Sequence, residues 1–286
     1  MISVIIPAYN EENGIASTIH EIQGILKKSS MEGCEIIIVN DGSTDKTAEI
    51  AGKLGVRVLN HPHNIGYGKS LKTGITHATH ETIVITDADC TYPFEEVPTL
   101  LKDYAKGFDM VVGARTGKNY KESFIKYPLR IILKFLVEFT AGRKIPDINS
   151  GLRIFKKSTV LPYLSTLCDT FSFTTSLTLA YMMTGKFVHY HPIAYAEREG
   201  KTKVKLFRDS LRTLQYILQA MNYYNPLKVF LLFSGLCIFL SLLGFLMSAF
   251  LGLNSGFLLG IGGLLVALLS LCFGLIADLL KQIMHK

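Results

Sequence analysis

Two aspartates separated by one residue follow an apolar segment in the first third of the chain. The segment TIVIT, residues 82–86, is rich in β-branched residues, and Asp87 and Asp89 come directly after it. Carboxylates are the hard oxygen ligands that Mg²⁺ and Mn²⁺ prefer, and Mg²⁺ keeps coordination positions open for phosphates. Two like charges at the end of a buried strand cost free energy unless a cation neutralises them. The pattern therefore predicts a divalent metal site at Asp87 and Asp89.

Polar and acidic residues also follow three other apolar segments. They occur in PAYNEEN at residues 7–13, in NDGSTD at residues 40–45 and in ART at residues 114–116. A single aspartate in such a place, such as Asp41 beside Gly42, is more often a turn residue than a ligand. Their repetition at several segment ends instead predicts one shared binding edge.

The apolar segments alternate with helical patterns. The predicted strands are residues 2–6, 35–39, 56–59, 82–86 and 109–113, and the predicted helices are residues 12–28, 44–54, 67–78 and 94–104. This alternation is typical of an α/β domain with a largely parallel sheet covered by helices. Ligands of such sheets bind beyond the carboxyl ends of the strands, which is where the aspartates lie.

Other nucleotide-binding patterns are missing from the sequence. GYGKS at residues 66–70 contains GKS, but His63 occupies the position at which a P-loop needs its first glycine. No GxGxxG pattern opens the first helix. The net charge of +7 fits contact with anionic lipid or with phosphates, whereas nucleic acid is a weaker interpretation because no nucleic-acid-binding motif accompanies the charge.

The C-terminal part of the chain predicts a membrane hairpin. Residues 229–277 contain no Asp, Glu, Lys, Arg or His, and the runs 229–250 and 257–277 approach or exceed the roughly 20 residues that a spanning helix needs. LNSG at residues 253–256 predicts the turn. Basic residues flank both ends of the hairpin, so a multi-pass protein of the plasma (inner) membrane with both termini cytoplasmic is expected. The N-terminus lacks the basic segment of a signal peptide, so export of the large domain is not expected.

Two amphipathic segments precede the hairpin. In residues 123–142, Lys126, Arg130 and Lys134 recur at every fourth position while apolar residues fill another face, as in a helix lying at a membrane interface. Residues 206–224 predict a second such helix; for both, packing on the domain is the alternative. The expected organisation is a catalytic domain at residues 1–205, an interfacial helix at 206–226 and a transmembrane hairpin at 227–286.

Histidine, cysteine and glycine groups have simpler interpretations. HPH at residues 61–63 and HYH at residues 189–191 have no acidic or cysteine partner at a zinc spacing, so structural or solvent-facing histidines are expected. The five cysteines lie far apart without CxxC, which is typical of reduced thiols. The glycines of GIGG, residues 260–263, allow close helix packing and a homo-oligomer through the hairpin.

Six motifs in one order resemble the family 2 glycosyltransferases of the GT-A fold. Between residue 2 and about residue 206 they are PAYNEE, VNDGSTD, DADCTYPFEE, VVGAR, INSGLRIFKK and GKTKV. The chain is similar to the dolichyl-phosphate mannose synthase and undecaprenyl-phosphate glycosyltransferase group, including its two-helix membrane anchor. The resemblance implies transfer of one sugar from a nucleotide sugar, of UDP-glucose or GDP-mannose type, to a polyprenyl phosphate. It leaves open which sugar, nucleotide and polyprenol are used.

The resemblance also implies roles for individual residues. Those implied to bind the nucleotide sugar are Pro7, Ala8, Tyr9, Glu11, Val39, Asp41, Asp87, Ala88, Asp89, Arg115, Arg198 and Lys203. The implied ligands of Mg²⁺ or Mn²⁺ are Asp87, Asp89 and Thr91, which stands where the family often has glutamine. Residues expected near the acceptor phosphate are Arg115, Lys126, Arg130 and Lys134, and Arg153 lies in a matching basic segment. Asp89, Arg115 and Arg130 are the expected catalytic residues.

The expected reaction needs little acid–base chemistry from the protein. A polyprenyl phosphate with a second pKa of about 6, like a phosphoamino acid, is already an anionic nucleophile at neutral pH. The site must supply alignment, a metal for the leaving diphosphate and cations that bring two anions together, and direct displacement inverts the anomeric carbon. Asp147 is expected either to orient a sugar hydroxyl or to be a turn residue.

Two other classes of function are less favoured. A processive polysaccharide synthase needs more membrane helices and a QxxRW motif, and the chain has no tryptophan. A catalytically silent scaffold of the same fold does not need the paired aspartates and nearby arginines, all of which are present.

Overall fold

The computed structural model describes residues 1–117, 127–196 and 206–284, without the side chains of residues 127–130 and 206–209. The chain forms two compact units, Met1–Tyr216 and Ile217–Lys286. The first contains a seven-stranded sheet, and the second contains two long apolar helices.

The sheet of the first unit is mostly parallel. Its order is β3-β2-β1-β4-β6-β5-β7, and β6 is antiparallel to both neighbours. The strands are β1 (Ile2–Ala8), β2 (Glu35–Asn40), β3 (Arg57–Asn60), β4 (Thr82–Ile85), β5 (Met110–Thr116), β6 (Arg153–Lys156) and β7 (Val188–Ala194). Because β1, β2, β4 and β5 share one direction, their carboxyl ends meet at one edge, and the amino end of β6 lies at that edge as well.

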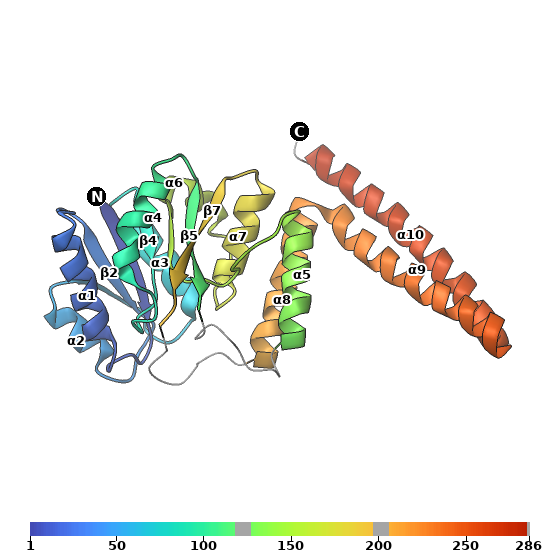
Figure 1. Ribbon diagram of the computed structural model, residues 1–286, viewed down its shortest axis with the longest axis horizontal. Coiled ribbons are helices and arrows are strands. Elements are labelled where there is room, and N and C mark those ends of the chain that lie inside the picture. Colours follow the sequence, from blue (N-terminus) through green and yellow to red (C-terminus); the bar gives the residue numbers. More distant parts are fainter. Residues whose placement is uncertain (118–126, 197–205, 285–286) are drawn as a thin grey trace. The chain divides into compact units, whose positions relative to one another are not determined.

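Helices cover both faces of this sheet. The helices of the first unit are α1 (Ile15–Lys28), α2 (Thr47–Lys53), α3 (Tyr67–His77), α4 (Val97–Tyr104), α5 (Tyr127–Ala141), α6 (Lys157–Val160) and α7 (Phe173–Met183), and α8 (Leu206–Tyr224) crosses the division between the units. Figure 1 shows α1 and α4 in front of the sheet and α3 behind it.

The alternation of side chains along each strand explains how both faces of the sheet are buried. Val4 and Ile6 of β1 belong to a buried apolar cluster with residues of α1 and α4, whereas Ile5, between them, faces Gly74 of α3. Successive side chains of a strand point to opposite faces, so a run with no polar residue, such as the centre of β1, is buried from both sides.

The five predicted strands are confirmed, with ends that differ by up to three residues, and the mostly parallel α/β class is confirmed. The sequence analysis missed β6, β7 and α7. β6 has only four residues, and β7 contains two histidines and Pro192, so neither has a strong apolar pattern. Pro192 is tolerated because β7 is an edge strand of the sheet, where a missing backbone donor costs little.

The two amphipathic helices form close to where they were predicted. α5 exposes Ile131, Ile132 and Phe135, each about half accessible, and α8 has the predicted bounds. Within the first unit, the Thr213 hydroxyl of α8 lies 2.6 Å from the Ser172 hydroxyl, just before α7.

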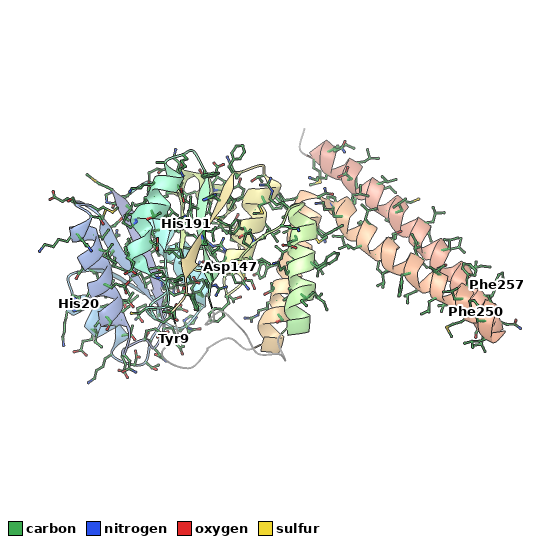
Figure 2. All side chains as sticks on the ribbon, in the orientation of Figure 1. Tyr9, His20, Asp147, His191, Phe250 and Phe257 are labelled. Carbon is green, nitrogen blue, oxygen red and sulfur yellow. The ribbon has the colours of Figure 1, made fainter. Side chains whose placement is uncertain are left out.

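The second unit is a helical hairpin. α9 (Pro226–Leu251) and α10 (Asn254–Met284) are both long and apolar enough to cross a membrane by length and composition, since at 1.5 Å per residue they span about 39 and 46 Å. Phe250 and Phe257 lie at the turn (Figure 2). The turn was predicted at residues 253–256, but only Gly252 and Leu253 lie outside the helices. Gly252 ends α9 with a left-handed φ of 64°, which glycine adopts without a side-chain clash, so the next helix can begin at Asn254.

The hairpin helices contact each other through small residues. A Cβ on Gly244 would lie 2.8 Å from the Gly256 carbonyl, and one on Gly260 would lie 2.6 Å from the Phe245 ring. The Ser234 hydroxyl donates to the Ala267 carbonyl across the hairpin at 3.0 Å. Gly260 and Gly263 of the GIGG segment therefore serve packing within the chain, and the homo-oligomer stays a prediction.

Candidate active site

The loops that follow β1 and β2 are tied together at the carboxyl edge. The Asn10 amide donates to the Ser43 hydroxyl at 3.0 Å, and the Thr44 amide donates to the Asn10 side-chain oxygen at 2.8 Å. The Glu11 amide donates to the Thr47 hydroxyl at 2.8 Å. These bonds join PAYNEE and NDGSTD, which are distant in sequence, into one rim.

Asp41 organises the loop that precedes α3. Its side chain is buried, and its two oxygens accept hydrogen bonds from the Asn64 side chain and from the backbone amides of Ile65 and Gly66, and pair with the His61 ring at 2.7 Å. His61 is therefore a structural histidine, as predicted. These contacts assign Asp41 a positioning role, and its predicted contact with the nucleotide stays a prediction.

Asp87 is held by groups from two other elements. The Tyr67 hydroxyl at the start of α3 donates to Asp87 Oδ1 at 2.9 Å. Burial, followed by the charge of Asp87, raises the pKa of Tyr67 well above its ordinary value, so Tyr67 is a hydrogen-bond donor at neutral pH. A Cβ on Gly151 would lie 2.8 and 2.9 Å from the two Asp87 oxygens. Glycine at residue 151 thus leaves room for the carboxylate.

Asp89 is oriented by the residue two positions later. The Thr91 hydroxyl donates to Asp89 Oδ1 at 2.6 Å, and the Thr91 amide donates to the same atom at 3.3 Å. Between them, Cys90 adopts a left-handed φ of 53°, an uncommon conformation for a residue with a side chain. Thr91 is fully buried and orients Asp89 through these two hydrogen bonds, and its role as a metal ligand stays a prediction.

Arg115 and Asp147 form a two-point ion pair at the end of β5. Arg115 Nε lies 2.7 Å from Asp147 Oδ2, and Nη2 lies 2.9 Å from Oδ1. Burial by itself raises the pKa of the Asp147 carboxyl, but hydrogen bonds and charge from Arg115 outweigh burial, so this pKa lies below its ordinary value. Asp147 also accepts the Asn149 amide at 3.1 Å, an Asx turn. The turn role is confirmed, and the ion pair was not foreseen.

Aromatic side chains connect this ion pair with the aspartates. The Arg115 guanidinium lies 5.4 Å from the centre of the Tyr195 ring, and Tyr195 packs edge-on against Tyr92. The Tyr92 hydroxyl accepts the Gly151 amide at 2.7 Å. Burial raises the pKa of the Tyr92 hydroxyl above its ordinary value, while the charge of Arg115 lowers it and the charge of Asp87 raises it further.

Arg153 does not belong to the site, contrary to its placement among the basic segments. It is fully buried in β6 and donates to the carbonyls of Ser150 and Ile148 and to the Thr178 hydroxyl, each at 2.8 Å. A buried guanidinium needs such partners because an unpaired buried charge is costly. Arg153 therefore holds the loop of residues 147–152 in place.

The remaining residues predicted to bind the nucleotide sugar range from the carboxyl edge of the sheet to the buried core. Tyr9 lies at the carboxyl edge (Figure 2), whereas Ala8, Val39 and Ala88 are buried, and Val39 is in the core. The Ala88 carbonyl accepts the Thr18 hydroxyl at 3.0 Å. Pro7 is a residue of β1, and Glu11 lies in the loop described above. Their roles in donor binding stay predictions.

Of the predicted basic residues, four lie wholly or partly outside the described residues. Lys126, Arg198 and Lys203 lie outside the described residues, and of Arg130 only the backbone on α5 is described. Lys134 lies on α5, half exposed, 3.9 Å from Glu138. Ala196, the last described residue before one gap, donates its amide to the Thr91 carbonyl at 3.1 Å.

The donor set at this edge fits Mg²⁺ or Mn²⁺. Asp87 and Asp89 offer carboxylate oxygens, and the hydroxyls of Tyr67 and Thr91 orient them, as supporting residues do around metal ligands.

Sequence reasoning missed Tyr67, Tyr92, Asp147 as a partner of Arg115, and Gly151. Tyr92 directly follows the acidic segment, so its position was a usable signal. Tyr67 was considered only as part of a false P-loop pattern. Gly151 reaches Asp87 only because β6 inserts antiparallel between β4 and β5, which no local pattern indicated.

Solved structures show that the first unit has a fold of the GT-A type. A glucosyl-3-phosphoglycerate synthase from Mycobacterium tuberculosis, in complex with Mn²⁺, uridine diphosphate and glucosyl-3-phosphoglycerate, superposes with a TM-score of 0.61 at 21% identity, covering 77% of this chain and 79% of that chain. A complex of the same synthase with Mg²⁺ and uridine diphosphate gives a TM-score of 0.61 at 20% identity over the same shares.

Sequence comparisons define the family. Residues 3–161, more than half of the chain, match Glycosyl transferase family 2, and the chain belongs to this family. A dolichyl-phosphate hexose transferase of Haloferax volcanii is 30% identical over 72% of this chain and 87% of its own length. An undecaprenyl-phosphate 4-deoxy-4-formamido-L-arabinose transferase of Salmonella choleraesuis is 27% identical over 80% of this chain and 69% of its own length. The low-salt glycan biosynthesis hexosyltransferase Agl6 of Haloferax volcanii is 30% identical over 76% of this chain, and the match spans about half of that relative, 53%.

Proposed function

We propose that this protein is a membrane-bound hexosyltransferase that moves one sugar from a nucleotide sugar to a polyprenyl phosphate. The observation that carries the proposal is the assembly of Asp87, Asp89 and the Asp147-bound Arg115 at one sheet edge, in a chain that also contains a hairpin long enough to span a bilayer. Relatives named as transferases acting with dolichyl phosphate and undecaprenyl phosphate support this acceptor class.

Donor binding depends on the two aspartates. Asp87 and Asp89 hold Mg²⁺ or Mn²⁺, and the bound ion supplies neutralisation of the charge that develops on the leaving diphosphate. Tyr67 and Thr91 restrict the rotation of the two carboxylates. The rim made by the loops after β1 and β2 receives the nucleoside, through Pro7, Ala8, Tyr9, Glu11, Val39 and Asp41.

Arg115 serves the acceptor side of the reaction. Guanidinium groups bind phosphate oxygens in a planar, two-point geometry, and Asp147 restricts the orientation of this one. The phosphate acceptor is an anion at neutral pH and needs no strong general base. A single in-line displacement by its oxygen breaks the bond between the sugar and the diphosphate and inverts the anomeric carbon.

The acceptor reaches the site from the bilayer. α5 presents exposed Ile131, Ile132 and Phe135 together with Lys134, which suits a helix at the headgroup level. We expect Lys126 and Arg130 to bind the acceptor phosphate, and Arg198 and Lys203 to bind the diphosphate of the donor. The basic residues that flank the hairpin support a cytoplasmic location for the catalytic unit and both termini.

A panel of donors tests the proposal. The full chain in detergent is incubated with Mg²⁺ or Mn²⁺, undecaprenyl or dolichyl phosphate, and labelled UDP-glucose, UDP-galactose, UDP-N-acetylglucosamine or GDP-mannose. Label is expected in the lipid phase with one of them, and EDTA or Asp89→Ala is expected to lower the rate at least about 100-fold, because several kcal/mol of transition-state stabilisation are lost.

The control is Glu49→Ala, which removes an exposed carboxylate on α2 and should leave the rate unchanged. Nucleotide release without labelled lipid would contradict a polyprenyl-phosphate acceptor. Metal-dependent nucleotide binding without turnover of any donor would favour the silent scaffold.

A further inference from the structure

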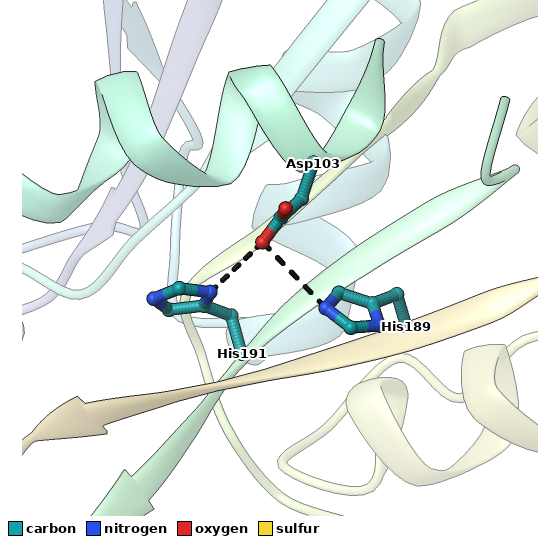
Figure 3. Close-up of side chains that lie close together, drawn as sticks. All are labelled: Asp103, His189 and His191. Carbon is teal, nitrogen blue, oxygen red and sulfur yellow. Dashed lines mark hydrogen bonds and ion pairs between the residues drawn. The ribbon is translucent and has the colours of Figure 1, made fainter. Parts of the chain in front are cut away.

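A second group of metal-binding side chains lies on the α4 side of the sheet. Asp103 belongs to the last turn of α4, and His189 and His191 belong to β7. The two histidines are two residues apart on a strand, so both point to the same face of the sheet. Figure 3 shows both rings directed at the Asp103 carboxylate. The sequence analysis found no acidic partner for HYH at a zinc spacing, and the partner in the structure, Asp103, lies on a helix 86 residues before His189.

The distances suit a small transition-metal ion. Asp103 Oδ2 lies 2.8 Å from His191 Nδ1 and 3.5 Å from His189 Nε2, and the three ligand atoms lie within 4.8 Å of one another. In a tetrahedral site with bonds of about 2.0 Å, ligand atoms are about 3.3 Å apart. The two distances from Asp103 Oδ2 differ from that spacing by about 0.5 Å at His191 and about 0.2 Å at His189.

We propose that Asp103, His189 and His191 bind a divalent transition-metal ion of the Zn²⁺ class, with water at the fourth position. Two imidazoles and one carboxylate are borderline ligands that favour Zn²⁺ or Co²⁺ over Mg²⁺. Three protein ligands plus an exchangeable water are a common zinc arrangement. Such an ion links α4 to β7, an edge strand of the sheet.

Neighbouring groups orient the three ligands. The Phe108 ring stacks on the His189 ring with centres 4.7 Å apart. Lys106 Nζ lies 2.6 Å from Asp103 Oδ1, which leaves Oδ2 as the oxygen directed at the histidines.

The position separates this cluster from Asp87 and Asp89. His189 pairs with Val111 near the amino ends of β7 and β5, and His191 pairs with Gly113 at their centres, whereas the paired aspartates follow the carboxyl end of β4. In Figure 2, Tyr9 lies at the carboxyl edge and His191 lies above it. The cluster is thus a site in its own right and does not depend on the proposed transfer reaction.

Zinc binding to the full chain in detergent tests the inference. The parent protein carries Asp89→Asn to weaken binding at the paired aspartates, and Zn²⁺ is titrated by calorimetry. One Zn²⁺ per chain is expected, with binding at least tenfold weaker after His189→Ala together with His191→Ala. The matched control is His20→Ala together with His77→Ala, which removes two exposed histidines of α1 and α3 and should leave zinc affinity unchanged.

Two further measurements separate metal binding from loss of folding. Co²⁺ bound to the parent should show visible d–d absorption, and this band should be absent from the double His189 and His191 variant. Lys106→Met removes a positive charge next to Asp103 and is expected to tighten Zn²⁺ binding several-fold, a gain that misfolding cannot produce. Zinc binding of equal strength in the double variant and the parent would overturn the inference, as would a parent that binds no Zn²⁺ at micromolar concentration.

Discussion

At the scale of single residues, the site depends on side chains that hold other side chains. Asp147 acts through Arg115, Thr91 through Asp89, and Tyr67 through Asp87. Each supporting residue comes from a different loop or helix from the one that carries its partner, except Thr91. The charged groups are therefore held in orientation before substrate arrives, which reduces the cost of ordering them during the reaction.

Gly151→Ala tests how closely this arrangement is packed. The new methyl group would lie about as close to both Asp87 oxygens as a hydrogen-bond partner does, so Asp87 must move away from its hydrogen bond with Tyr67. We expect metal-dependent nucleotide binding to weaken at least tenfold, about 1.4 kcal/mol, as measured by calorimetry. Gly52→Ala is the control, since a Cβ there meets nothing within 4 Å. Equal nucleotide binding by the two variants would show that Asp87 does not need this space.

The Arg115–Asp147 pair predicts a pH dependence of stability. The folded-state pKa of Asp147 lies below its ordinary value, so the pair contributes fully above the unfolded value of about 3.9 and is lost as the pH falls through the lowered folded-state pKa. Asp147→Ala should lower the free energy of unfolding at pH 7 by about 3 kcal/mol, because it removes the buried carboxylate of a two-point ion pair with Arg115.

Below pH 4, the free energy of unfolding of the Asp147→Ala variant should fall less steeply with pH than that of the parent protein. Denaturant unfolding at a series of pH values measures both effects. Glu49→Ala, which breaks the exposed pair with Lys53, should cost less than about 1 kcal/mol. A loss from Asp147→Ala no larger than that would contradict the strength assigned to the buried pair.

At the scale of elements, α5 is the proposed contact with the membrane surface. Its exposed residues Ile132 and Phe135 have no role in the core, because about half of each side chain is accessible. Apolar residues gathered on one exposed helix face indicate a binding surface more often than chance exposure does.

Replacing Ile132 and Phe135 by serine tests this role of α5. We expect the KM for the polyprenyl phosphate to rise about tenfold, because apolar area that enters the interface is lost, while the KM for the donor stays constant. The control is Phe187→Ser, an exposed phenylalanine just before β7. If both variants raise the acceptor KM equally, α5 has no special part in acceptor binding.

At the scale of the whole molecule, a sugar-transfer unit and a membrane hairpin share one chain. The hairpin has two helices among the described residues, so the segments before and after it lie on the same side if both helices span. The turn, residues 252–253, then lies on the opposite side.

Ser255→Cys in a protein without other cysteines tests this topology. Ser255 is exposed next to the turn, so a membrane-impermeant maleimide should label it from the face opposite the catalytic unit in sealed vesicles of known orientation. The comparison protein keeps only the exposed Cys90 and should react only from the cytoplasmic face. Labelling of both positions from one face would contradict a spanning hairpin.

The sequence by itself determined the features that depend on local composition. Periodicity, run length and residue type are properties of neighbouring residues in the sequence. They predicted the apolar strands, α8, the hairpin and the aspartates after β4. Only the tertiary structure decided which distant residues meet. The antiparallel insertion of β6 brought Gly151 to Asp87, and the packing of α4 on β7 brought Asp103 to His189 and His191. Such contacts depend on strand order and helix packing, which are set by burial across the whole domain and leave no pattern in any one segment.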